Sequence, residues 1–156
     1  MDIRRASETD IDSLLELNRQ IGEFHYQHAP HIFEKPSAAE KAFLINALKD
    51  TDRLFLVANV SGKVVGFLTA IINKNELVPF INKDPICRIS TIVVDQNQRK
   101  QGIGKTLISS CRTWANQLGA GEIRLEVMEF NKEAQQFYNK LGFKNSSRIL
   151  SKIIND

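Results

Sequence analysis

The sequence predicts a mixed α/β fold in one domain that spans residues 1–156. The chain has 156 residues, of which 42% are hydrophobic, so it falls in the size range of one compact domain. Apolar β-forming runs alternate with helical patterns along its length, with no internal repeat and no linker between them. The predicted order is strand, two helices, hairpin, strand, loop, helix, strand, helix and strand.

Two helices are predicted near the N-terminus. Ser7-x-x-Asp10 has the form of a capping box, and apolar residues at near-helical spacing follow it over residues 10–26. Ser37-x-x-Glu40 is a second capping signature and begins a shorter helix with its own apolar stripe. A loop is expected between the two helices.

The middle of the chain has the pattern of a hairpin followed by a buried strand. Residues 53–60 and 64–72 are rich in apolar and β-forming residues, and Ser61-Gly62-Lys63 between them is typical of a turn. A polar connection covers residues 73–85. Residues 86–94 are apolar at nearly every position of their second half, which predicts a central strand covered on both faces.

The last third of the chain is predicted to alternate between helix and strand. Apolar residues on one helical face predict a helix over residues 103–118, closed by the glycines that follow. Alternation over residues 122–127 predicts a half-buried strand. Asn131 can cap a final helix that Gly142 ends, and residues 143–154 are expected to form a last strand or hairpin.

Composition excludes several classes of protein. The formal net charge is only +3 and the basic residues are scattered, which disfavours nucleic acid and favours a small polyanionic ligand. No apolar stretch approaches about 18 residues and the first residues lack a signal peptide's apolar core, so we expect a cytoplasmic protein without a membrane partner. Cys87 and Cys111 are too few and too far apart for a disulfide framework or a zinc site, and are expected to be buried, unreactive thiols.

Residues 99–106, Arg-Lys-Gln-Gly-Ile-Gly-Lys-Thr, connect the apolar strand to the amphipathic helix. Unpaired N–H groups at a helix start, together with the helix dipole, form an anion site. Gly102 and Gly104 remove side chains that would block close approach, and Arg99, Lys100 and Lys105 add positive charge. The loop therefore favours a ligand with two or more phosphates, the alternative being a plain turn with surface cations.

Two nucleotide-binding motifs compete for the same loop. Gly104-Lys105-Thr106 completes the second half of the nucleoside-triphosphate pattern G-x-x-x-x-G-K-[ST], but its first glycine is replaced by the bulky Arg99. The dinucleotide fingerprint G-x-G-x-x-G fails because its third glycine falls on Leu107, and no early βαβ unit precedes the loop. Both classes are disfavoured.

Two segments resemble the GCN5-related N-acetyltransferases. Arg99-x-x-Gly102-x-Gly104 matches that family's loop, Q/R-x-x-G-x-G/A, which follows its fourth strand. The run Asn131-x-x-Ala134-x-x-Phe137-Tyr138-x-x-Leu141-Gly142-Phe143 is similar to its segment N-x-x-A-x-x-[FL]-Y-x-x-x-G-F. The resemblance implies a mostly antiparallel sheet with a parallel, splayed strand pair at the cofactor and four flanking helices.

The resemblance also implies roles for individual residues. The loop amides would hold the pyrophosphate of acetyl-coenzyme A, the strand before the loop would pair with the pantetheine arm, and Tyr138 would protonate the leaving thiolate. The residues expected to bind the cofactor are Ile92, Val93, Val94, Arg99, Lys100, Gln101, Gly102, Ile103, Gly104, Lys105, Thr106, Asn131 and Phe137. Asn131 and Tyr138 also have purely structural explanations, as a helix cap and a core aromatic.

Glu126 is the candidate general base. It lies on the polar face of the predicted strand over residues 122–127, and its context is similar to N-terminal acetyltransferases of the ribosomal-protein type, which use such a Glu. A solvated strand carboxylate is the alternative. A base is needed because an alkylammonium with a pKa near 10.4 is only about one part in 2,500 free amine at pH 7. Direct transfer in a ternary complex is expected rather than a cysteine acyl-enzyme.

The acceptor amine is not encoded by any recognisable motif. In the family the acceptor site is usually shaped by the first two helices with their connection, here residues 24–36, and by the connection over residues 73–85. His25, His28 and His31 are expected to line it rather than to bind a metal, because Pro30 breaks the helix. We expect a small-molecule amine or a peptide or protein amine as acceptor. A homodimer and a non-catalytic acyl-coenzyme A sensor stay open.

Overall fold

The computed structural model describes residues 1–155, and their contacts divide the chain into two compact units, Met1–Glu126 and Val127–Asp156. The first unit holds the sheet and the first three α-helices, and the second holds the last helix and the C-terminal segment. The prediction of one domain over residues 1–156 stays a prediction. No helix of the described chain is both long and apolar enough to cross a membrane.

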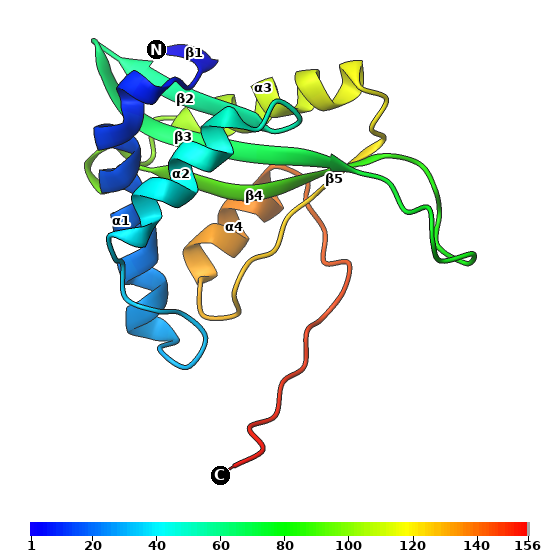
Figure 1. The fold of residues 1–156 in the computed structure, drawn as a ribbon. Coiled ribbons are helices and arrows are strands. Elements are labelled where there is room, and N and C mark those ends of the chain that lie inside the picture. The colour runs from blue at the N-terminus through cyan, green and yellow to red at the C-terminus, as the bar shows by residue number, and fades with distance from the viewer. Residues whose placement is uncertain (156) are drawn as a thin grey trace. The chain divides into compact units, whose positions relative to one another are not determined.

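The sheet of the first unit contains five strands in the spatial order β1-β2-β3-β4-β5 (Figure 1). The strands are β1 (Asp2–Arg5), β2 (Leu54–Val60), β3 (Lys63–Asn73), β4 (Ile86–Val94) and β5 (Glu122–Arg124). Neighbouring strands are antiparallel except β4 and β5, which are parallel. The prediction of a mixed, mostly antiparallel sheet with one parallel pair is therefore confirmed.

Helices cover both faces of this sheet. Helices α1 (Ile11–His28) and α2 (Ala39–Lys49) lie on one face, and α3 (Ile103–Gln117) lies on the other (Figure 1). Gly66 and Phe67 are neighbours in β3 and so face opposite sides. Phe67 belongs to the core cluster that includes Leu14 and Leu17 of α1, whereas a Cβ at Gly66 would lie 3.3 Å from the Ile103 side chain of α3.

Both N-terminal capping signatures are formed. The Ser7 N–H donates to Asp10 Oδ2 at 2.9 Å, and Arg4 donates to both oxygens of the same carboxylate at 2.8 and 2.9 Å. Asp10 lies in a short 3-10 helix, so α1 begins one residue later than predicted and runs two residues further. The Ser37 N–H donates to Glu40 Oε2 at 2.5 Å ahead of α2. The two capping pairs thus lie at the 3-10 turn before α1 and just ahead of α2.

Three sequence expectations about strands were wrong. Strand β5 ends at Arg124 rather than at residue 127, and residues 143–155 form no strand. Strand β4 is not covered on both faces, because Arg88 and Ser90 are exposed. The first two errors share a physical reason: an alternating or apolar pattern forms a strand only where a partner strand satisfies its backbone, and β5 pairs only with residues 86–88 of β4.

Candidate cofactor and acceptor site

The loop between β4 and α3 is anchored where it leaves the sheet. The Asp95 N–H donates to the Val65 carbonyl at 2.8 Å, and the Asp95 side chain accepts from the Asn97 N–H at 2.8 Å, which begins a short 3-10 helix over Gln96–Gln98. Gln20 of α1 adds a long-range tie: its Oε1 accepts from the Gln96 N–H at 3.1 Å, and its Nε2 donates to Asp95 Oδ2 at 3.4 Å. Sequence reasoning missed Gln20, because nothing in its local pattern distinguishes it from other glutamines on helices.

The loop reverses direction at two residues with left-handed backbone. Lys100 has φ +63° and Gly102 has φ +80°, and a Cβ at Gly102 would meet nothing within 4 Å. The Thr106 N–H then donates to the Gly102 carbonyl at 3.0 Å as the first bond of α3. The N–H groups of residues 103–105 precede that bond and have no partner inside the helix, so the loop presents them with the positive end of the helix dipole.

The predicted cations surround this helix start. Arg99, Lys100 and Lys105 are exposed, and none of them forms a hydrogen bond or ion pair within residues 1–155. Ile103 is buried and fixes the first turn of α3 against the sheet. Free amides, a left-handed glycine and uncommitted cations at this helix start are compatible with a pyrophosphate group, and the anion cradle itself stays a prediction.

Strand β4 has an open edge next to the loop. It pairs with β3 from Ile86 to Val94, whereas on its other side only residues 86–88 pair with β5. Residues 89–94 therefore have no described strand on that side, and Ile92, Val93 and Val94 lie within this stretch. Backbone groups along such an edge are free to pair with an extended chain that carries amides.

The second motif forms helix α4 (Lys132–Lys140) in the C-terminal unit. The Asn131 Oδ1 accepts from the Ala134 N–H at 3.2 Å, so the capping prediction is confirmed. Gln135 Nε2 donates to the carbonyls of Met128 and Glu129 at 2.9 and 3.1 Å and holds the segment before the helix. Gly142, with φ +90°, follows the end of α4 as predicted.

Tyr138 lies among aromatic rings of its own unit. Its ring centroid is 5.3 Å from that of Phe137 and 5.7 Å from that of Phe143. Burial raises the pKa of Tyr138 to about 12, so its hydroxyl keeps its proton at neutral pH. That hydroxyl makes no hydrogen bond with any other described residue.

Glu126 lies at the end of the first unit, two residues beyond β5. Its side chain is exposed and forms no ion pair or hydrogen bond with the rest of the described chain. The structure therefore corrects its predicted setting, which is an unpaired segment and not the polar face of a strand. The loop, β4 and Glu126 belong to the first unit, while Asn131, Phe137 and Tyr138 belong to the second.

The two cysteines, distant in sequence, meet in the core. Cys87 of β4 and Cys111 of α3 are fully buried free thiols, with their sulfurs 3.7 Å apart. The hydrogen bond with Cys87, reinforced by burial, raises the pKa of the Cys111 thiol. A buried, protonated thiol is a poor nucleophile, which disfavours a cysteine acyl-enzyme.

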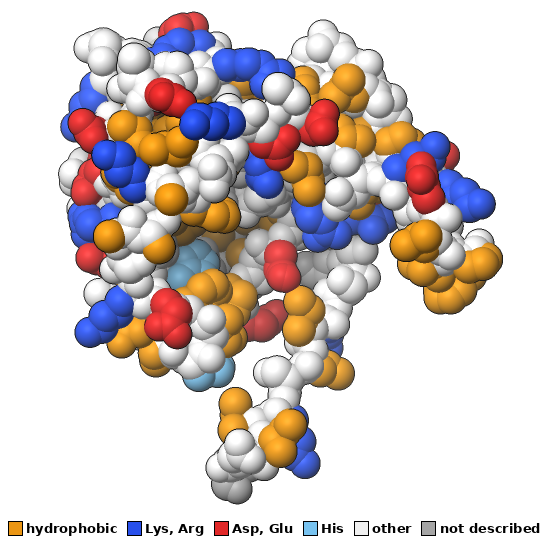
Figure 2. All heavy atoms as spheres, viewed as in Figure 1, with side chains coloured by type: hydrophobic (Ala, Val, Ile, Leu, Met, Phe, Trp, Pro, Cys, Tyr) orange, Lys and Arg blue, Asp and Glu red, His pale blue; other side chains and the backbone are white. Residues whose placement is uncertain are grey.

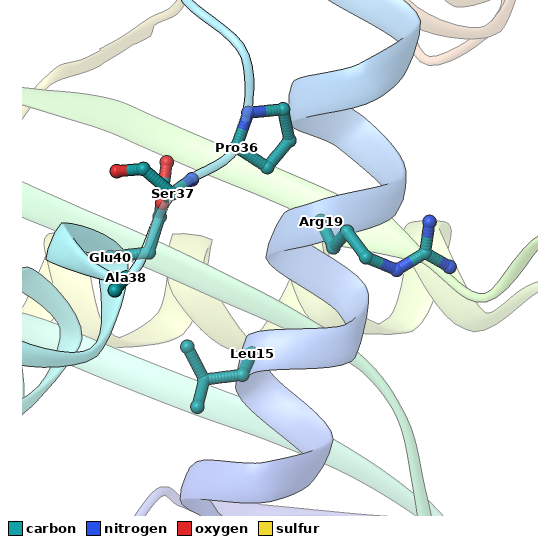
Figure 3. Close-up of a pocket in the computed structure, with 6 residues that line it drawn as sticks. All are labelled: Leu15, Arg19, Pro36, Ser37, Ala38 and Glu40. Carbon is teal, nitrogen blue, oxygen red and sulfur yellow. Dashed lines mark hydrogen bonds between the residues drawn. The ribbon is translucent and has the colours of Figure 1, made fainter.

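A surface groove of about 350 Å³ lies between α1 and the segment that leads into α2 (Figure 3). Leu15 and Pro36 line it, and Arg19 points away from Pro36 and Ser37. The Arg19 guanidinium donates to Glu16 at 2.6 Å and to Glu23 at 2.7 Å, and it lowers the pKa of Glu16 to about 2. The arginine of the groove is thus already paired, and the carboxylate of the groove, Glu40, accepts the Ser37 N–H.

Two of the three histidines bond back along their own helix. The Nδ1 atoms of His25 and His28 bond to the carbonyls of Ile21 and Phe24 at 2.8 Å, one turn back along α1. No group of three or more metal-ligating side chains gathers anywhere in residues 1–155.

The connection over residues 73–85 exposes apolar side chains, including Leu77 and Phe80 (Figure 2).

Comparison with known proteins gives consistent results. Residues 12–143 match the model of the acetyltransferase (GNAT) family. The chain is 30% identical to an N-alpha-acetyltransferase of Sulfurisphaera tokodaii over 91% of this chain and 79% of that protein. Among solved structures, a mutant of protein BH1408 from Bacillus halodurans has a TM-score of 0.93 at 23% identity, covering 99% of both chains. An aminoglycoside N-acetyltransferase, AAC(6')-Iy in complex with CoA, has a TM-score of 0.78 at 22% identity, covering 99% of this chain and 95% of that one.

Proposed function

Because this chain belongs to the acetyltransferase (GNAT) family, it is an acyl-coenzyme A-dependent N-acetyltransferase, and we propose that it moves an acetyl group directly to a primary amine. The observation that carries the proposal is the loop over residues 99–106, a backbone anion cradle beside the open edge of β4. The same cradle in a nucleotide hydrolase would need a small residue at Arg99.

The donor is acetyl-coenzyme A, the cosubstrate of this family. We propose that the amides of residues 101–105 hold its pyrophosphate and that Arg99, Lys100 and Lys105 screen the remaining charge. Ile92, Val93 and Val94 are proposed to pair with the pantetheine amides along the β4 edge, as the unpaired backbone there supports. Thr106 closes the cradle, and Asn131 and Phe137 are proposed to contact the rest of the arm.

Glu126 is proposed as the general base. Its exposed and unpaired carboxylate is free to take a proton from the ammonium, directly or through water. The free amine then attacks the thioester carbonyl, a C–N bond forms, the C–S bond breaks, and the nitrogen releases its second proton to solvent, from which Tyr138 regains the proton that it gives to the sulfur. Tyr138 is proposed to give its proton to the departing sulfur. Its pKa of about 12 keeps the hydroxyl protonated at neutral pH but makes it a weak acid towards a thiolate, so its contribution is expected to be modest.

Membership of the family does not determine which amine accepts the acetyl group. A similar protein is named for acetylation of α-amino groups and another for acetylation of aminoglycosides. Our proposal covers a small-molecule amine or the amine of a peptide or protein, and both have an alkylammonium that must lose a proton before attack.

The experiment follows free thiol release from acetyl-coenzyme A with amino acids, peptides, polyamines and aminoglycosides as acceptors. We expect at least one amine to accelerate release and to gain one acetyl group, which mass spectrometry detects. Binding of the cofactor without any accelerated release would instead favour an acyl-coenzyme A sensor and would contradict the proposed reaction.

A further inference from the structure

A second cavity, of about 100 Å³, lies between α2 and the sheet of the first unit. Phe43, Phe55 and Phe67 form its apolar wall, and Arg53, Ser90 and Thr91 form its polar wall. One water needs only about 10–15 Å³ of such space, so the cavity can take a small polar group. Phe43 is 68% exposed, and so the cavity opens to solvent at its rim.

Arg53 brings an incompletely paired charge into this cavity. Its Nη1 donates to Ser90 Oγ at 3.2 Å, whereas its Nε is buried and has no hydrogen-bond partner within residues 1–155. The nearest anion is Asp50, whose Oδ2 lies 3.8 Å from Nε, beyond hydrogen-bond distance. A buried donor without an acceptor is costly, so this site favours an incoming acceptor atom.

The chemistry of the guanidinium selects the kind of group that fits. Its planar fork of N–H donors matches the two oxygens of a carboxylate, and such charge-assisted pairs are stronger than neutral hydrogen bonds. Asp50 Oδ2, 3.8 Å from Arg53 Nε, shows that a carboxylate can lie beside this guanidinium while leaving Nε without a hydrogen bond. The side chain of Asp50 is 43% exposed and can give way to a better-placed anion.

The cavity borders the part of β4 that is proposed to bind the donor. Thr69 pairs with Thr91 and Ala70 with Ile89, so Ser90 is the extra residue of a β-bulge. Ser90 and Thr91 both line the cavity, and Ile92 is the next residue along the strand. A group bound at Arg53 therefore lies beside the strand segment that leads to the loop.

We propose that Arg53 binds a carboxylate of the acceptor, so that the enzyme acetylates amines that carry a carboxylate near the amino group. The inference rests on the proposed function and narrows its substrate class. The carboxylate has two sources, the main-chain carboxylate of a free amino acid or the acidic side chain of a peptide. Purely cationic acceptors such as polyamines would leave the Arg53 donors unpaired.

The test compares matched acceptors with and without this carboxylate, with kcat/KM expressed per concentration of free amine, because amidation of an amino acid also lowers the pKa of its α-ammonium group. One pair is an amino acid and its amide, and the other is a peptide amide that begins with Asp and one that begins with Asn. We expect wild-type protein to favour the acidic member of one pair, which identifies the source, and Arg53→Met to reduce that preference by about tenfold. Each acceptor is measured on both proteins, so the intrinsic reactivity of the amines cancels.

A matched variant, Asp50→Asn, removes the carboxylate charge that competes with the acceptor for Arg53. It keeps the side-chain oxygen that accepts from the Asp52 N–H. It is expected to lower KM for the acidic acceptor, an effect that a merely structural role of Arg53 would not produce. Thermal denaturation and coenzyme A affinity show whether Arg53→Met is folded.

Equal kcat/KM for both members of both pairs in the wild type would overturn the carboxylate preference while leaving acetyl transfer intact. A preference that survives Arg53→Met in folded protein would also overturn it. If no amine accelerates thiol release, the proposed reaction fails, and titration of the same acceptors into coenzyme A-loaded protein decides the Arg53 site by itself.

Discussion

The donor loop and the Arg53 cavity belong to the same unit but are built from different parts of the chain. The loop over residues 99–106 is one continuous segment whose backbone supplies the donors. The cavity is assembled by side chains from α1, α2 and three strands, and its charge comes from one arginine. Local spacing in a sequence can reveal the first kind of site, whereas the second kind appears only after folding.

This contrast explains why the acetyl donor can be inferred from the sequence while the acceptor cannot. A backbone cradle must have small residues at fixed positions, so the same pattern recurs wherever the same phosphate groups are held. An acceptor pocket has no such constraint, because side chains from any element can line it. We therefore expect the donor to be shared with the family and the acceptor to be particular to this chain.

The largest predicted effect concerns the chemistry at the acceptor. Glu126→Gln should lower kcat/KM at pH 7 by about 100-fold, because general-base catalysis typically contributes a factor of that size. The loss should shrink as pH rises, since more of the amine is then already deprotonated. A pH–rate profile from 6.5 to 9.5 measures this. If the two profiles are parallel, Glu126 is not the base.

A smaller effect is predicted at the leaving group. Tyr138→Phe should reduce turnover by about tenfold, because a thiol with a pKa near 8.5 leaves with little help. Since burial raises the pKa of Tyr138 to about 12, the tyrosine stays protonated from pH 6 to 10 and the ratio of the two rates should be constant there. Phe143→Leu is the control, as it removes a ring neighbour but no proton. A ratio that varies with pH would contradict the role.

The free energy of unfolding is also expected to depend on pH, through the Asp10 carboxylate. Arg4, aided by the Ser7 N–H, holds the pKa of the Asp10 carboxyl below its ordinary value. A lowered native pKa stabilises the fold above the unfolded pKa of about 3.9, and this stability is lost as pH falls through the native value. Asp10→Asn should therefore cost about 1–2 kcal/mol at pH 7 and less near pH 3. Urea denaturation at both pH values measures this, and equal costs would contradict it.

The smallest effect is predicted for single cations of the loop. Lys105→Gln should weaken coenzyme A binding only about threefold at low salt, because an exposed charge is screened by solvent. The difference should nearly vanish in about 0.5 M salt. Titration calorimetry at both ionic strengths checks this, with Lys63→Gln, in the β2–β3 hairpin, as the control. A large loss that persists in salt would mean that the side chain, rather than the backbone, holds the phosphates.

Much of the fold could be predicted because its signals are local. The hairpin over β2 and β3, the bounds of β4 and the caps of α1, α2 and α4 follow from turn residues, apolar runs and capping pairs. The strand expected over residues 122–127 was too long because the number of paired residues depends on the neighbouring strand, and β5 meets β4 over only three residues. The same limit applies to residues 143–155, where Leu150 and Ile154 are 91% and 90% exposed.

The parts of the site formed by residues close together in sequence could be predicted, and the contacts between distant residues could not. The start of α3 follows from the spacing of two glycines and an apolar stripe, whereas the left-handed backbone of Gly102 was not predicted. The tie from Gln20 to Gln96 spans 76 residues, and the bond from Arg53 to Ser90 spans 37, so no short pattern could indicate either. Gly66 gave a usable signal, because an isolated glycine inside a strand often marks a close approach, here to the Val93 carbonyl.

The central claim is that the backbone of the loop holds the pyrophosphate of the donor. Calorimetric titration of coenzyme A and of pantetheine, which lacks the pyrophosphate, into wild-type protein and Gly104→Val tests it most directly, with Gly121→Val as a control at an open, unstrained glycine. We predict that wild-type and Gly121→Val proteins bind coenzyme A far more tightly than pantetheine, and that Gly104→Val loses at least about tenfold of this preference. An unchanged preference in folded Gly104→Val protein would contradict the claim.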